Sequence, residues 1–177
     1  MDIKTLFGLP AHALLVHIPL VLIPLAAIGA LGLFWEPWRR RFGWATAVIL
    51  IVAGIFTQLA IGSGQALKGE LNRTALLRAH TQIAENIRPF LLVFFIALVA
   101  FLYLERRMRT TGTSVTMRNP MLIGTFAATL LFAGLSTYWA VRIGHTGSKA
   151  VWQPKISHES GENRNSTQEK PGSENGG

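Results

Sequence analysis

Histidines are the side chains best suited to bind a metal or cofactor in this chain of 177 residues, which contains no cysteine. Four of the five lie beside long apolar runs, at His12, His17, His80 and His145. Neutral imidazole is a ligand for iron, copper, zinc and nickel, and imidazoles from two helices can bind a haem iron axially. The absence of cysteine excludes thiolate metal sites and iron–sulfur clusters held by this chain alone.

The elements that must position these histidines are membrane-spanning helices. Only 15% of the residues are charged, whereas an average soluble protein has roughly 25%, and the charges lie between long apolar runs. We therefore predict an all-α fold: an integral membrane four-helix up-down bundle that forms one domain, residues 1–156. Its spans are expected over about 12–35, 44–66, 78–104 and 119–144.

Two segments of this scheme are less regular than the rest. The third span has a short uncharged part, so its helix is expected to begin near His80, which places Pro89 inside the helix, where it would kink it. The tail, residues 157–177, is polar and almost free of apolar side chains. It cannot bury enough surface to fold and is expected to be disordered, with His158 as a solvated ring.

Arginines distinguish the two ends of the predicted bundle. They cluster between the first two spans and between the last two, at Arg39, Arg40, Arg41, Arg106, Arg107, Arg109 and Arg118. The positive-inside rule places both clusters in the cytoplasm and both termini on the opposite side. Because the basic residues occupy these connections, the net charge of +8 does not indicate a nucleic-acid-binding face.

The histidines gather at the end opposite the arginines. In an up-down bundle, odd spans begin where even spans end, so all four lie near one membrane face. With a helix rise of about 1.5 Å per residue, His12, His80 and His145 lie about 34 to 36 Å from the other face. His17 lies about 7 Å deeper than His12, on a helix face rotated by about 140°.

Two interpretations of this layer remain open. The rings can be ligands in the bundle core, where helical bundles usually hold cofactors. His17 and His80, on diagonal helices, are then the preferred axial pair for a b-type haem, and Arg88 and Arg142 are candidates to bind its propionates. Alternatively, the rings lie at the membrane interface because they have an apolar body and a polar tip, and the arginines snorkel there.

The stretch LPAHALLVHIPL, residues 9–20, resembles the opening motif of a family of predicted bacterial membrane proteins called domain of unknown function 2231. Further matching pieces are Ser63-Gly64, His80, Gly144-His145-Thr146-Gly147 and Val151-Trp152. The resemblance implies a four-span integral membrane protein without a firmly assigned activity. Some members are joined to Rieske-type iron–sulfur domains, which implies electron transfer near a haem or a quinone.

The leading hypothesis is a redox protein of the bacterial inner membrane. It would bind haem b near the periplasmic face through two of the four histidines, and transfer electrons between a quinone and a periplasmic redox partner. A transition-metal-binding or transport protein is the first alternative, because three imidazoles at one level suit such an ion. The second alternative is a non-catalytic membrane subunit or scaffold. The sequence predicts neither a specific enzymatic reaction nor an oligomeric state.

Overall fold

The computed structural model describes residues 5–6, 9–67, 83–112 and 119–168. Within these ranges the chain forms two very short strands followed by long helices. The elements are β1 (Thr5–Leu6), β2 (Leu9–Pro10), α1 (Ala11–Gly32), α2 (Glu36–Leu67), α4 (Ile87–Thr110) and α5 (Pro120–Gln168). The strands pair with each other in antiparallel register. The predicted all-α class is therefore confirmed.

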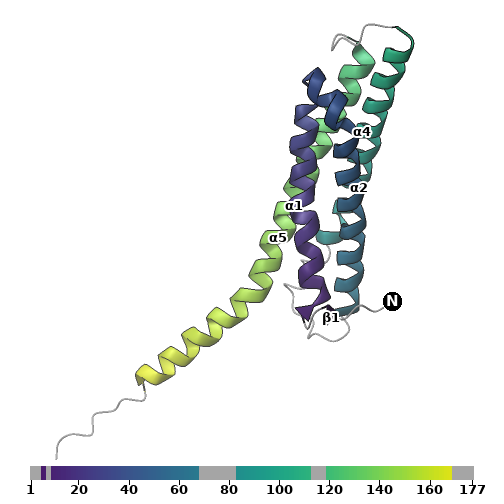
Figure 1. The fold of residues 1–177 in the computed structure, drawn as a ribbon. Coiled ribbons are helices and arrows are strands. Elements are labelled where there is room, and N and C mark those ends of the chain that lie inside the picture. Colours follow the sequence, from purple (N-terminus) through teal and green to yellow (C-terminus); the bar gives the residue numbers. More distant parts are fainter. Residues whose placement is uncertain (1–4, 7–8, 68–82, 113–118, 169–177) are drawn as a thin grey trace, which may run out of the picture.

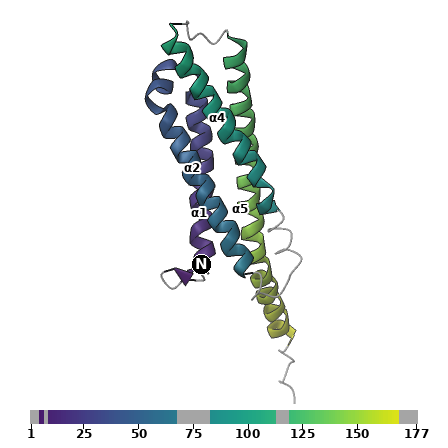
Figure 2. The ribbon, with the colours of Figure 1, turned by 90° about the vertical axis from the view of Figure 1, so that its right-hand side faces the viewer.

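The long helices lie side by side and run alternately in opposite directions (Figures 1 and 2). α1 contacts α2 and α5, and α4 contacts α5 and α2. We call the end where α1 joins α2, and α4 precedes α5, the arginine end. The opposite end, where α1 begins and the apolar part of α5 finishes, is the histidine end. This alternation brings histidines from different helices to one end.

Apolar side chains form both the core and the outer surface. α1 buries Ile23, Ala26 and Ala30 at helical spacing, and α4 buries Phe94 and other large residues against them. Many large apolar residues on the outside of all four helices are exposed, which is the arrangement expected of helices surrounded by lipid. Among the described residues, four stretches are long and apolar enough to cross a membrane: Leu15–Gly32, Glu36–Gln65, Ile83–Thr110 and Pro120–Ser148.

α2 begins earlier than the predicted position 44. It starts at Glu36, so the three consecutive arginines lie in its first two turns rather than in a loop. Pro37 is accommodated in the first turn, where backbone N–H groups have no partner within the helix. A glutamate is also favourable there because it faces the positive end of the helix dipole. The helix start therefore follows from Glu36 and Pro37, although the apolar run begins later.

The predicted start of the third span near His80 lies outside the described residues. Residues 83–85 are helical, Asn86 is a turn with helical dihedral angles, and α4 runs from Ile87. Pro89 is the third residue of α4, and helical residues 83–85 precede this helix. A proline has no N–H to donate to the carbonyl four residues earlier, here that of Glu85, and the turn at Asn86 lies within this gap.

α5 continues well beyond the apolar span. It extends as a helix to Gln168, past position 157 where we predicted a disordered tail. Figure 1 shows this last part (yellow-green) projecting away from the other helices. Extending an existing helix adds one hydrogen bond per residue and needs no new nucleus, so a polar segment can continue a helix without packing against the rest of the protein.

Candidate functional site

The structure brings two of the predicted ligands, His17 and His145, to the histidine end. His17 lies in the second turn of α1 and His145 near the end of the apolar part of α5, and both are exposed. His12 lies in the first turn of α1. His80 falls outside the described residues. Of the histidine layer predicted from chain topology, the structure therefore places His12 and His17 on α1 and His145 on α5.

The helix faces separate these histidines. α5 packs inward through a stripe that includes Ser136 and Ala140, and His145 follows Ala140 by five residues, about 140° around the helix. His145 is therefore on the outer face of α5. On α1, Pro19 is buried, and His17 precedes it by two residues, or about 200°. His12 precedes Pro19 by seven residues, which places that position on the same face as Pro19.

The two arginines predicted to bind propionates lie at the surface of the histidine end. Arg88 is exposed in the first turn of α4. The guanidinium of Arg142 lies 5.5 Å from the centre of the Trp139 ring. Trp139 in turn stacks on Phe90 of α4 at 5.8 Å between ring centres. Arg142 thus forms the outer layer of a cation–π and aromatic stack that joins α5 to α4.

A side chain of α1 packs against the glycine next to His145. A Cβ atom added to Gly144 would lie 2.9 Å from Leu20 Cδ2, so the absence of a side chain at Gly144 makes room for Leu20. On the other side of this end, Gln65 Nε2 donates a hydrogen bond to Glu85 Oε1 at 3.1 Å. These contacts hold the helix ends of both pairs, α1 with α5 and α2 with α4, in place.

The donor groups do not form a ready metal cluster in the part of the chain that the structure describes. No group of three or more histidine, aspartate or glutamate side chains that could hold an ion occurs there. A three-imidazole site would need His12 or His80, whose side chains are outside the described set. Haem requires only two axial ligands, so this finding bears more on the metal-ion alternative than on haem.

A family model described as a predicted membrane protein, DUF2231, matches residues 8–159. The chain belongs to this family. No curated protein and no solved structure matches the chain. The DUF2231 match begins before α1 and ends within the projecting part of α5, so it covers all four apolar stretches and every histidine discussed here.

A second group of polar side chains lies at the arginine end of this DUF2231 protein, and the sequence analysis missed it. Arg39 Nε donates a hydrogen bond to Glu105 Oε1 at 3.1 Å, and both residues are buried, with 4% and 7% of their surface exposed. Arg109, one turn after Glu105, donates to the same oxygen. Arg39 Nη1 also donates to the Leu33 carbonyl at 3.0 Å.

Glu105 was hidden among the arginines that we assigned to membrane orientation. Its four-residue spacing from Arg109 predicts an ion pair within a helix. Its burial could not be predicted from the sequence, because its other partner, Arg39, lies 66 residues away on α2. The cluster has no open coordination position or reactive group, so we interpret it as a clamp that joins the ends of α1, α2 and α4.

Proposed function

We propose that this protein binds a b-type haem at the histidine end and transfers electrons between a membrane quinone and a redox partner on that side. The observation that carries the proposal is the distribution of histidines: His12 is in the first turn of α1, His80 precedes α4 in the sequence, and no histidine lies between α1 and α2 or between α4 and α5, at the arginine end. The haem would supply one-electron chemistry, and the chain would supply axial imidazoles and a dry surrounding that set its potential.

The helix faces decide which imidazoles fit a haem. A pair made of His17 and His145 does not fit inside the bundle, since both rings are exposed and His145 is on the outer face of α5. The position of His12 fits better, because it is in line with Pro19 and Ile23, which are buried on α1. We therefore prefer His12 to His17 as the α1 ligand, which changes the pair favoured from sequence.

His80 remains the proposed second ligand, from the sequence alone. It precedes α4, and α4 contacts α2 and α5 and lies diagonally across from α1. His12 and His80 would thus supply imidazoles from two different parts of the chain to hold a haem. Arg88 and Arg142 are exposed at this end, and their guanidinium groups would bind the haem propionates.

An absorption spectrum with matched variants tests this proposal. The full-length chain, purified in mild detergent from cells supplied with haem precursor, should show a Soret band that shifts on reduction with dithionite. His12→Ala and His80→Ala should abolish the band, whereas His17→Ala and His145→Ala should keep it. A colourless protein would contradict haem binding. If that colourless protein retained a stoichiometric transition metal, the metal-binding alternative would replace the proposal.

A further inference from the structure

The arginine end carries more positive charge than its own carboxylates can pair. Arg39 and Arg109 share the buried Glu105, and Arg40 pairs with exposed Glu36 at 2.6 Å. Arg106 is exposed, and within the described residues it has no acidic partner. We propose that Arg40 and Arg106 form a binding site for the phosphate of an anionic phospholipid, on the outer side of the contact between α2 and α4.

The two arginines lie within one helical turn of the same level. Their chain neighbours Arg39 and Glu105 form the 3.1 Å ion pair, and the next residue on each of the two antiparallel helices is displaced in opposite directions, which leaves a height difference of about 3 Å relative to that pair. The buried pair fixes the separation of the two helix ends at this level. Arg40 and Arg106 would therefore be neighbours across the contact, where one phosphate group could bind both guanidinium groups.

Both arginines also lie on the same side of that contact. Gly43 faces α4, because a Cβ atom there would lie 2.7 Å from Leu102 Cδ2. Arg40 is about 60° around α2 from Gly43, in the direction opposite to Thr46, whose side chain meets α1. Arg106 is about 40° around α4 from Leu102, in the direction opposite to the helix face that contacts α5.

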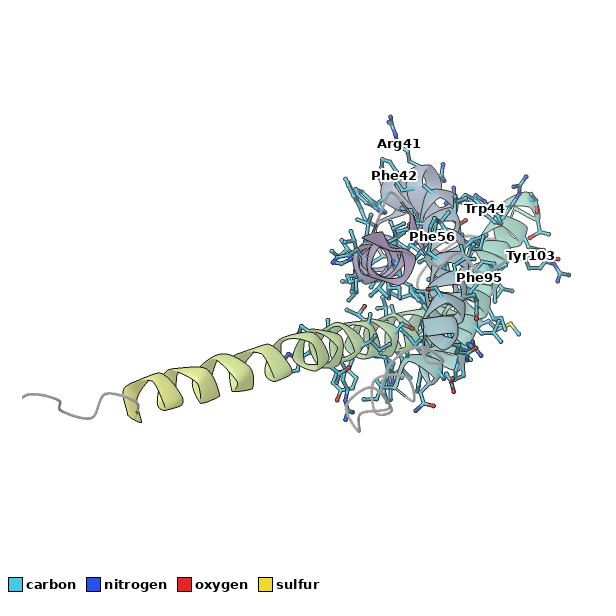
Figure 3. All side chains as sticks on the ribbon, turned by 90° about the horizontal axis from the view of Figure 1, so that it is seen from below. Arg41, Phe42, Trp44, Phe56, Phe95 and Tyr103 are labelled. Atoms are coloured by element: carbon cyan, nitrogen blue, oxygen red, sulfur yellow. The ribbon has the colours of Figure 1, made fainter. Side chains whose placement is uncertain are left out.

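Aromatic rings lie one turn deeper on this same side. Trp44 follows Arg40 by four residues, and Tyr103 precedes Arg106 by three. They are 54% and 60% exposed and point outward from α2 and α4 on the side away from α1 (Figure 3). Trp and Tyr favour the headgroup level of a bilayer. Exposed Ile51 and Ile96 continue these rows seven residues deeper, where acyl chains would lie.

This order from charge to aromatic ring to aliphatic side chain matches a phospholipid and not a soluble anion. Guanidinium groups bind phosphate oxygens in a bidentate manner, and basic pockets between membrane helices bind anionic headgroups. Glu36 competes for Arg40, but their pair is exposed and therefore weak. A lipid phosphate that also contacts Arg106 has two cations available and can displace it.

Thermal unfolding of the full-length chain in mild detergent, titrated with phosphatidylglycerol, tests the site. The lipid should raise the unfolding midpoint, whereas phosphatidylcholine and inorganic phosphate should not. The double variant Arg40→Gln/Arg106→Gln should weaken the apparent affinity for phosphatidylglycerol roughly tenfold to thirtyfold, because each arginine is expected to contribute about one charge contact with the lipid phosphate. The matched control is Arg41→Gln with Arg107→Gln, which removes equal charge at the same end; Figure 3 shows Arg41 pointing away from α4.

The control pair should change the affinity by less than about twofold. Equal weakening by both pairs would show a general charge effect and overturn the site, as would an equal response to phosphatidylcholine or to inorganic phosphate. Glu36→Gln provides an independent readout, since freeing Arg40 should tighten phosphatidylglycerol binding. Unchanged or weaker binding in Glu36→Gln would overturn the proposal even if the Arg40/Arg106 variant failed to fold.

Discussion

Arg39 of α2 and Glu105 of α4 form a buried ion pair, with 3.1 Å between Nε and Oε1. Arg39 also donates to the carbonyl of Leu33, directly after the end of α1, so one guanidinium links α2, α4 and the chain leaving α1. Its ring contact with Phe101, 6.0 Å to the ring centre, adds a cation–π interaction. The pair lies at the end opposite the histidines and holds the helix ends there in a fixed arrangement.

Removal of the carboxylate should be strongly destabilising. In Glu105→Ala, Arg39 would remain buried without its counter-ion, and breaking a buried pair in this way costs about 3–5 kcal/mol. Glu36→Ala breaks the exposed pair with Arg40 and should cost less than about 1 kcal/mol. Thermal unfolding in detergent compares the two variants. Equal losses, or no loss in Glu105→Ala, would show that the buried pair is not the clamp described here.

Gly29 is required where α1 crosses α2. A Cβ atom there would lie 2.7 Å from Thr46 Oγ1 and 2.9 Å from Thr46 Cγ2. Rotation of Thr46 about χ1 would still leave at least one of its two γ atoms near the added Cβ, and its hydroxyl already donates to the Phe42 carbonyl. Gly29→Ala should therefore lower the free energy of unfolding by about 1–3 kcal/mol.

Gly134 provides the matched control for this substitution. It lies in α5, and a Cβ atom added there meets nothing within 4 Å. Gly134→Ala should be neutral or raise the free energy of unfolding by up to about 1 kcal/mol, because alanine favours the helix. If Gly29→Ala were as well tolerated as Gly134→Ala in the same unfolding assay, the close approach of α1 and α2 would be disproved.

Ser136 is a residue whose replacement by alanine should stabilise the protein. Its hydroxyl oxygen is buried and has no hydrogen-bond partner among the described residues. Ser136→Ala removes this unpaired polar group and should raise the free energy of unfolding by about 1 kcal/mol, more than the difference of about 0.5 kcal/mol in helix propensity. Thr129, whose hydroxyl donates to the Thr125 carbonyl at 2.7 Å, should instead lose stability when changed to alanine. A destabilised Ser136→Ala would indicate that this hydroxyl has a partner in the membrane.

The sequence predicted the helices better than their ends. Uncharged runs located three of the spans because membrane helices must be long and apolar, whereas the third span was also predicted from the helical spacing of apolar residues before its short uncharged part. The start of α2 at Glu36 was missed because three arginines follow it, and charge was taken as a sign of a connection. The turn at Asn86, directly before Ile87, was not predicted because the apolar periodicity of the sequence continues through it.

The sequence predicted at which end of the protein the histidines lie, but not toward which side of each helix they point. Chain topology placed His17 and His145 at one end, since this depends only on the number of spans between them. Their orientation depends on which face of each helix packs, and hydrophobic periodicity is weak in helices that are apolar on every side. The buried positions of Pro19 and Ala140 supplied that missing information and shifted the preferred α1 ligand from His17 to His12.

The haem content of the purified full-length chain tests the proposed function most directly. Cells supplied with haem precursor should yield about one haem b per chain by pyridine haemochrome analysis, bound by two axial histidines. His12→Ala should lose it, and His145→Ala should retain it. Protein that is folded, purified under the same conditions and contains no haem would contradict the account, and so would haem that remains bound when both His12 and His80 are replaced.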